Sequence, residues 1–364
     1  MKPRVTIQHV AAAVGVSNQT VSRVINNKPD VSKATRARVL QVIQEMGYEP
    51  NLLARGLVSN KTFTLGLIMD DFSDPFYAQI IAAAEAEARR LNYFFLICSA
   101  ERNPSDEIKF LKLFSSRRVD GILLLALPTS EEQYQYILYL CEQGLPIVSI
   151  ASHLLEEKIS IVDVDNVDGG YQATRCLLQG GRRRIGMITG PITSKATQDR
   201  LQGYQMALKE AGLPYEPDLI AFGDWTYRSG FFAMSQLLEK GLHLDGMFVQ
   251  NDRMAMAAMT AIRQAGLELP DDIAMVGYDD TPDAAFTTPP LTTIRQPAQE
   301  LGKFATRLLV NLVNDPEMSV QHTLLKTELI ERGSCGVLVK NKKQKTGLKK
   351  AYSLHKQKRR TTES

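Results

Sequence analysis

Cysteine, long hydrophobic runs and a secretory leader are scarce or missing in this 364-residue sequence. The four cysteines are scattered without a C-x-x-C pair, which favours buried thiols in a reducing compartment over disulfides or a zinc site. No stretch of about 18 or more apolar residues occurs, which argues against a transmembrane helix. The first nine residues, M-K-P-R-V-T-I-Q-H, lack the apolar core of a secretory signal. We therefore expect a cytoplasmic protein with no membrane partner.

Catalytic motifs are also missing. The five histidines are dispersed and form no H-E-x-x-H metal motif, and no G-x-S-x-G nucleophile elbow occurs. The segment G-P-I-T-S-K (190–195) lacks the second glycine of a phosphate-binding loop. The sequence therefore predicts no catalytic residue, no metal site and no cofactor, and the protein is not expected to be an enzyme.

The net charge of +3 conceals an uneven distribution. Residues 1–60 carry a net charge of +5 and residues 337–364 a net charge of +9, whereas residues 61–336 carry −11. A basic head on an acidic body suits a polyanionic partner at the head only. The composition of the basic tail predicts disorder. The tail is interpreted as a solvated end of the chain, and weak nonspecific attraction to nucleic acid is the alternative.

The first 48 residues have the pattern of a helix-turn-helix. Gly15 follows a short segment with apolar residues at helical spacing, and glycine takes the left-handed turn that ends a helix without steric cost. Ser17 then caps a second helix with an apolar inner face, and Ser32 caps a third. The outer face of the second helix carries side chains that can hydrogen-bond to bases and phosphates: Asn18, Gln19, Ser22, Arg23 and Asn26. An ordinary three-helix cap with a solvated polar face is the alternative.

Residues 5–57 resemble, without a gap, the amino-terminal headpiece of the lactose/galactose repressor family. The resemblance rests on T-I-Q-H-V-A-A-A-V-G-V-S-N-Q-T-V-S-R-V-I-N and on the P-N-x-x-A-R-x-L hinge. It implies a DNA-binding head (1–48), a hinge helix with linker (49–61), and a nucleoid-associated protein that binds a near-palindromic double-stranded operator. The implied DNA-binding residues are Thr6, Ser17, Asn18, Gln19, Thr20, Ser22, Arg23, Asn26, Asn51, Arg55 and Leu57.

From Leu65 onward, short apolar runs alternate with segments long enough for helices, which predicts parallel sheets covered on both faces. Polar pairs follow three of the runs, at Asp70–Asp71, Asn251–Asp252 and Asp279–Asp280. Parallel sheets bind ligands beyond the carboxyl ends of their strands, so these pairs favour a cleft there. Each pair taken alone is equally consistent with a cap on the following helix.

The body resembles the same family, whose core is similar to periplasmic sugar-binding proteins. The matching segments include D-D-F-S-D-P-F-Y (70–77), D-R-L-Q-G-Y (199–204) and N-D-R-M-A-M (251–256). The resemblance implies an effector-binding and dimerisation domain (62–336) with two parallel-sheet lobes between which the chain crosses three times. The expected first lobe comprises about 62–162 and 292–323, and the second about 163–291 and 324–336, followed by the disordered tail (337–364). The implied effector-binding residues are Asp71, Phe76, Arg200, Trp225, Asn251 and Asp279.

The segments beyond residue 222 are most similar to the lactose-repressor branch of the family, which implies a galactoside inducer. Ala151 stands where the family commonly has an acidic residue that touches the ligand, and this leaves the sugar open. The tail has no leucine heptad of the kind that forms tetramers, so a homodimer is expected.

Taken together, these patterns predict a transcriptional repressor whose operator binding is controlled by a small-molecule effector. A purine effector, a solute-binding protein without DNA function, and a sugar-processing enzyme that pairs Asp279 with Asp280 are the alternatives.

Overall fold

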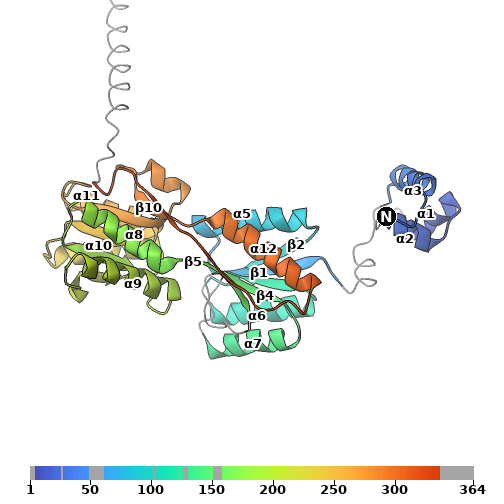
Figure 1. The fold of residues 1–364 in the computed structure, drawn as a ribbon, viewed down its shortest axis with the longest axis horizontal. Helices are drawn as coiled ribbons and strands as arrows, with labels where there is room; N and C mark the ends of the chain where they lie inside the picture. The colour runs from blue at the N-terminus through green and yellow to red at the C-terminus, as the bar shows by residue number, and fades with distance from the viewer. Residues whose placement is uncertain are drawn as a thin grey trace, which may run out of the picture.

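The computed structural model describes residues 5–25, 28–48, 61–101, 103–125, 130–150 and 158–336, which form a helical head and a two-lobed body (Figure 1). Several residues named above, namely Asn26, Asn51, Arg55, Leu57 and Ala151, lie outside these ranges, as do most of the hinge and the tail. Among the described residues, no helix is both long enough and apolar enough to cross a membrane.

The head consists of α1 (Ile7–Val14), α2 (Asn18–Ile25) and α3 (Lys33–Met46), as the sequence predicts. Gly15 ends α1 with φ 75° and ψ 36°, the left-handed conformation expected of it. The Oγ atom of Ser17 accepts a hydrogen bond from the Thr20 backbone N–H at 3.1 Å, so Ser17 caps α2. Val10, Val21 and Val39, one from each helix, are fully buried together and form the centre of the head.

The first lobe contains a six-stranded sheet with strand order β11-β5-β4-β3-β1-β2, in which all neighbouring strands are parallel. Its strands are β1 (Thr64–Met69), β2 (Phe94–Ser99), β3 (Gly121–Leu124), β4 (Ile147–Ile150), β5 (Ser160–Val164) and β11 (His322–Leu325). Helices α5 (Pro75–Arg90) and α12 (Ala298–Asn314) cover one face, and α6 (Pro104–Ser116) and α7 (Glu131–Glu142) cover the other (Figure 1). Because side chains alternate along a strand, Leu67 packs towards α5 and α12 whereas Ile68 packs towards α6 and α7.

The second lobe repeats this arrangement with strand order β12-β10-β9-β8-β6-β7. Its strands are β6 (Ile185–Thr189), β7 (Ile220–Phe222), β8 (Gly246–Val249), β9 (Ala274–Asp279), β10 (Thr292–Arg295) and β12 (Glu328–Ile330). Helices α8 (Asn166–Gln179) and α9 (Lys195–Glu210) cover one face, and α10 (Tyr227–Glu239) and α11 (Asp252–Gln264) cover the other. Short 3-10 turns occupy Pro217–Leu219 and Pro282–Phe286. Strand β12 pairs antiparallel with β10, which is a departure from the all-parallel expectation.

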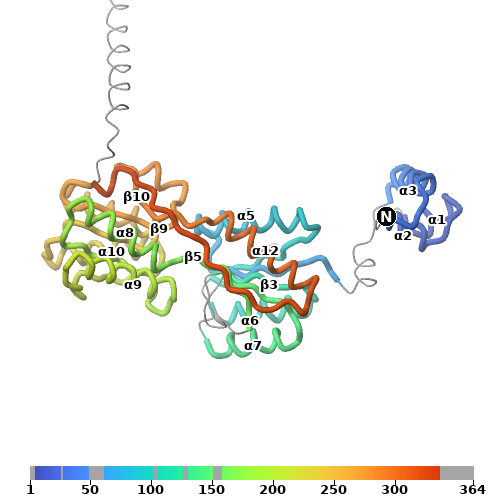
Figure 2. Tube along the Cα trace, viewed as in Figure 1, coloured from blue at the N-terminus to red at the C-terminus, as the bar shows by residue number. Residues whose placement is uncertain are grey.

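The chain crosses between the lobes three times, from β5 to α8, from β10 to α12 and from β11 to β12, and Figure 2 traces these connections. Each of these three crossings lies a few residues beyond the approximate boundary expected from the sequence. Strand β10 (292–295) pairs with β9 and belongs to the second lobe, so that crossing follows Arg295. Strand β11 pairs with β5 over its whole length, so 324–325 belong to the first lobe, as do 163–164 at the end of β5. The two-lobed architecture itself is the predicted fold class.

Candidate functional site

A cavity of about 100 Å³ lies between the two lobes at the carboxyl ends of their strands. Five of the six predicted effector-binding residues line it: Phe76, Arg200, Trp225, Asn251 and Asp279. Phe76 comes from the first turn of α5 and Arg200 from α9, while the other three follow or end strands of the second lobe. The sixth, Asp71, does not line the cavity, because its carboxylate is turned to Arg253 of the second lobe at 2.9 Å.

Arg200 is held in place by hydrogen bonds and by two aromatic rings. Its Nε donates a hydrogen bond to Asn166 Oδ1 at 2.8 Å, and its Nη1 donates to the backbone oxygen of Gln250 at 2.6 Å. Its guanidinium carbon lies 3.6 Å from the centroid of the Tyr278 ring and 5.5 Å from that of Trp225. The side chain is therefore buried, charged and oriented by four neighbours, which suits a planar donor for hydroxyl or carbonyl oxygens.

Trp225 is fixed through its own backbone and through the glycine beside its ring. It has φ 71°, a conformation that non-glycine residues rarely adopt. A Cβ atom at Gly190 would lie 2.1 Å from a carbon of the indole, so only glycine allows this packing. Asn251 Nδ2 donates to the Trp225 backbone oxygen at 3.0 Å. The indole can therefore present a defined face to a ligand.

Asn251 both caps a helix and lines the cavity, which are the two roles that the sequence suggested for polar residues that follow a strand. Its Oδ1 accepts from the Met254 backbone N–H at 2.9 Å and thus caps α11, while the residue also lines the cavity. Asp74 behaves in the same way, since it caps α5 through the Phe76 backbone N–H at 2.9 Å and lines the cavity. At both positions one side chain caps a helix and also lines the cavity.

Asp279 is buried at the end of β9 and has φ 110°. Its Oδ1 accepts a hydrogen bond from Gln296 Nε2 at 2.7 Å. Burial raises the pKa of Asp279 well above its ordinary value, and the nearby carboxylates of Asp252 and Asp74 raise it further, against a lowering by Arg200. This carboxyl can therefore both accept and donate hydrogen bonds to a polyol.

The neighbouring acidic residues have structural roles. Asp252 is fully buried beneath the site and accepts from the Thr281 backbone N–H at 2.8 Å and from Thr293 Oγ1 at 2.6 Å. Its burial raises its pKa to about 7. Asp280 faces away from the cavity and forms ion pairs with Arg295 at 2.7 Å and Arg332 at 2.5 Å. Asp279 and Asp280 therefore do not face a common substrate, which removes the observation behind the glycosidase alternative.

Several polar lining residues were not among the predicted effector-binding residues: Asp70, Asp74, Asp163, Asn166, Ser194 and Gln296. A signal for Asp163 was present, because a carboxylate inside the apolar run I-S-I-V-D-V is unusual. Asn166 follows the same strand. Gln296 follows β10, a strand that the sequence analysis did not recognise. These side chains complete the ring of hydrogen-bonding groups around the cavity.

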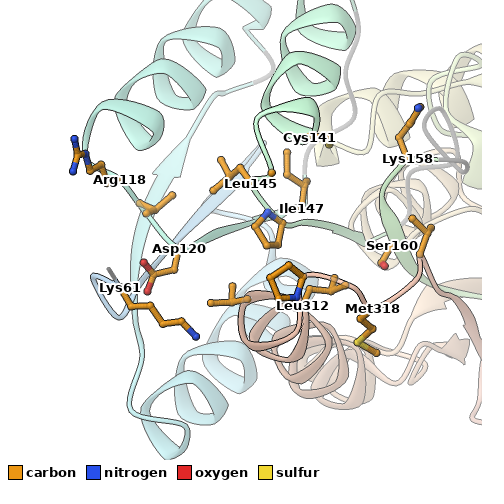
Figure 3. Close-up of a pocket in the computed structure, with 16 residues that line it drawn as sticks. Lys61, Arg118, Asp120, Cys141, Leu145, Ile147, Lys158, Ser160, Leu312 and Met318 are labelled. Atoms are coloured by element: carbon orange, nitrogen blue, oxygen red, sulfur yellow. The ribbon is translucent and has the colours of Figure 1, made fainter. Parts of the chain in front are cut away.

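A larger cavity, of about 580 Å³, lies at the opposite, amino-terminal ends of the strands of the first lobe (Figure 3). Its charged side chains do not converge on a ligand. Arg118 and Lys158 point outward, and Lys61 Nζ donates to Asn314 Oδ1 at 2.6 Å. Asp120 accepts from the backbone N–H groups of Thr62 and Phe63 at 2.8 and 2.7 Å. The cavity between the lobes is thus the better candidate for effector binding.

In the head, five predicted DNA-contacting residues have exposed side chains: Thr6, Ser17, Asn18, Gln19 and Arg23. Thr20 and Ser22 are half-buried, and Thr20 shares a hydrogen bond with Ser17 at 2.9 Å. Arg23 pairs with Asp30 at 3.2 Å, an exposed contact that water screens strongly. The outer face of α2 is therefore accessible to a partner.

Comparison with known proteins assigns both parts of the chain. Residues 6–51 match the family described as "Bacterial regulatory proteins, lacI family", and residues 154–335 match a periplasmic binding protein-like domain. The HTH-type transcriptional regulator CelR of Thermobifida fusca is 38% identical over 338 residues, which are 91% of this chain and 98% of CelR. The ribose operon repressor of Escherichia coli strain K12 is 36% identical over 329 residues, 90% of this chain and 99% of that repressor.

The chain belongs to the LacI family. LacI-family proteins are DNA-binding transcriptional regulators and not enzymes, which agrees with both predictions from the sequence. Among solved structures, the CelR–cellobiose complex has a TM-score of 0.70 and 36% identity, and covers 91% of this chain and 100% of its own. The lac repressor dimer bound to operator and the anti-inducer ONPF has a TM-score of 0.80 but only 28% identity, and covers 92% and 99%.

These identities correct one expectation within the LacI family. The segments beyond residue 222 predict greatest similarity to the lactose-repressor branch, yet over the whole chain CelR and the ribose operon repressor are more similar in sequence. The family assignment is confirmed, whereas a galactoside effector receives no support from the comparisons.

Proposed function

We propose that the protein is a homodimeric transcriptional repressor that binds a near-palindromic operator and releases it when a neutral sugar occupies the cavity between its lobes. The observation that carries this proposal is the composition of that cavity. An aromatic face, a fixed arginine and several amide and carboxyl groups converge there, and sugars are bound by such combinations.

The charges around the cavity favour a neutral ligand. Among the described residues, its lining includes four carboxyl groups, those of Asp70, Asp74, Asp163 and Asp279, and a single cationic side chain, that of Arg200. Burial favours the protonated form of Asp279, but the other three carboxyl groups still outnumber Arg200. A sugar phosphate would bring further negative charge into this low-dielectric space, and like charges repel strongly there. Uncharged hydroxyl groups can instead donate to the carboxyl oxygens and accept from Arg200. A solved structure of CelR is a complex with cellobiose, which supports an uncharged sugar as the ligand class.

We expect neutral sugars, but not sugar phosphates, to raise the melting temperature of the full chain. Ligands that bind the folded state stabilise it by about 2.7 kcal/mol at a concentration one hundred times Kd. The panel should contain D-ribose, cellobiose, glucose 6-phosphate and hypoxanthine. It should also contain lactose, because the segments beyond residue 222 resemble the lactose-repressor branch. Stabilisation by hypoxanthine alone would identify a purine-responsive regulator, and stabilisation by glucose 6-phosphate would contradict the charge argument.

Operator reading is proposed to depend on Asn18, Gln19 and Arg23, which lie on the exposed face of α2. Glutamine pairs with adenine and arginine with guanine through two hydrogen bonds in the major groove. Leu57, outside the described residues, is proposed from the family resemblance to enter the minor groove at the operator centre.

Gln19→Ala should weaken operator binding by about 1–3 kcal/mol and relax the preference at one base pair. The loss follows because alanine cannot form the paired hydrogen bonds to the base edge. Gel shifts with cognate and singly substituted operators measure both effects. Gln8→Ala, on the exposed side of α1, is the matched control and should bind with the same preference as the unaltered protein. An unchanged ratio of cognate to scrambled binding in Gln19→Ala would remove Gln19 from base reading.

Dimerisation is proposed to use the sheet edges formed by β2 and β7. These strands end their respective sheets at equivalent positions. Phe94 at the start of β2 is 56% exposed and Phe222 at the end of β7 is 67% exposed. Large exposed aromatic side chains beside an open sheet edge are typical of protein interfaces, and the lac repressor is a dimer in its operator complex.

A further inference from the structure

A single arginine connects the two lobes beside the effector cavity. Arg253 lies in the first turn of α11, in the second lobe, and its Nη1 donates to Asp71 Oδ2 at 2.9 Å and to Asp74 Oδ2 at 3.2 Å. Its Nη2 donates to Ser73 Oγ at 3.3 Å. All three acceptors belong to the connection between β1 and α5 in the first lobe. We call this group of four residues the Arg253 clamp.

The clamp is withdrawn from solvent. The side chain of Arg253 is 8% exposed, that of Asp74 9% and that of Asp71 25%. The guanidinium carbon also lies 5.2 Å from the centroid of the Tyr227 ring. Burial acts to raise the pKa of Asp71, but hydrogen bonds from Ser73 and Arg253 outweigh it and hold that pKa below its ordinary value. The clamp is thus a desolvated, charge-assisted contact, and such contacts depend strongly on both partners being present.

The clamp joins two helix ends that carry cavity residues. Asp74 caps α5, and two residues later Phe76 lines the cavity. On the other lobe, Asn251 caps α11 and lines the cavity two residues before Arg253. A contact between these two helix starts therefore determines the distance between Phe76 and the Trp225–Asn251 side, although Arg253 itself does not line the cavity.

We propose that Arg253 is a positioning residue for effector binding, which holds the lobes closed so that Phe76 and Trp225 contact the same sugar. This inference rests on the proposed effector function of the cavity. Opening the lobes returns Arg253, Asp71 and Asp74 to water, which lowers the cost of separating them, so the contact is reversible. The clamp raises the affinity for the sugar because it stabilises the closed lobes. Less of the binding free energy is then needed to close them.

Arg253→Met should weaken binding of cellobiose or D-ribose by about tenfold, as measured by quenching of the single tryptophan, Trp225. Arg253→Lys, which keeps the charge but not the planar fork, should recover part of the loss. In a double-mutant cycle, Arg253→Met and Asp71→Asn should be non-additive because they remove the same contact. Arg263→Met is the matched control, since Arg263 lies on the same helix and donates a hydrogen bond to the Thr288 backbone oxygen of its own lobe at 2.8 Å.

A second measurement does not need a ligand. Spin labels at Arg89→Cys on α5 and Lys240→Cys after α10 report the distance between the lobes of the full chain. Cys98 and Cys141, the half-buried thiols, are first replaced by serine. The labelled chain is mixed with an excess of unlabelled protein, so that the measured distance lies within one chain of a dimer. We expect one distance in this background and a longer, broader distribution when Arg253→Met is added. An unchanged distribution, or an equal change in Arg263→Met, would overturn the clamp.

The two measurements separate the two proposals. If the unaltered protein binds no sugar but Arg253→Met still opens the lobes, the effector proposal fails and the clamp between the lobes stands as a structural contact only. If the unaltered protein binds a sugar and Arg253→Met binds it equally well, the positioning role is wrong while the effector proposal stands.

Discussion

Replacing Arg200 with methionine should abolish the response to sugar while operator binding persists. Methionine keeps much of the length of the arginine side chain but donates no hydrogen bond. It therefore leaves the Gln250 backbone oxygen without its donor at 2.6 Å, and it leaves Asn166 Oδ1 with the weaker bond from the Tyr278 hydroxyl at 3.2 Å in place of the Arg200 bond at 2.8 Å. Leaving a buried acceptor unpaired typically costs about 1–3 kcal/mol, and the ligand loses its own bond to the guanidinium as well. We expect sugar binding, measured by Trp225 fluorescence, to weaken by roughly a hundredfold or more.

Two further variants separate this effect from a loss of folding. Arg183 is an exposed arginine of the same lobe, and Arg183→Met should bind sugar with the same affinity as the unaltered protein. Arg200→Lys keeps the charge without the planar geometry, so its sugar affinity should lie between those of Arg200→Met and the unaltered protein. Gel shifts establish that Arg200→Met still binds operator and no longer releases it with sugar. A normal sugar titration in a folded Arg200→Met would exclude Arg200 from the effector site.

The double substitution Phe94→Asp with Phe222→Asp should produce a monomer that binds operator at least a hundredfold more weakly. Both side chains are exposed at equivalent sheet edges, and a carboxylate there would be buried without a partner in a dimer. Two linked heads gain about 10²–10⁴ in avidity over one, because the second binds at high effective concentration. Sedimentation velocity measures the mass of the variant in solution and so its oligomeric state. Gel shifts with a full operator and a half-operator measure the loss of operator affinity.

The opposite edge of the first sheet provides the control for this experiment. Leu324 on β11 is 62% exposed, and Leu324→Asp should remain a dimer with normal operator affinity. A monomer from Leu324→Asp together with a dimer from the double variant would place the interface at β11. If neither change alters the mass, dimerisation depends on neither edge.

Local signals in the sequence were sufficient for the head and for the alternation of strands and helices. Gly15 can end α1 because it takes φ 75°, and Ser17 can cap α2 because its hydroxyl reaches a backbone N–H three residues on. Interactions of this kind involve neighbours in the chain and are encoded where they occur. The buried strands, such as β1 and β9, were recognisable because a strand covered on both faces is continuously apolar.

The short strands at the lobe crossings could not be recognised in that way. Strand β11 has alternating exposed and half-buried residues and pairs with β5, which lies about 160 residues earlier in the chain. Strand β12 has three residues and depends on β10 for its hydrogen bonds. Because these strands obtain their stability from distant partners, their own composition is weakly informative, and the lobe boundaries near 292 and 324 were misplaced for this reason.

By itself the sequence determined the family, the helix-turn-helix head and five of the side chains that line the cavity between the lobes. Only the tertiary structure decided how those side chains are used. Asp71 illustrates the difference. Its position after β1 predicted a ligand contact, whereas in the structure its carboxylate accepts a hydrogen bond from Arg253, 182 residues away. The sequence around Arg253 predicts a solvent-exposed side chain in the first turn of a helix. Its burial between two lobes results from the packing of segments that are remote in the chain, and no local pattern records that packing.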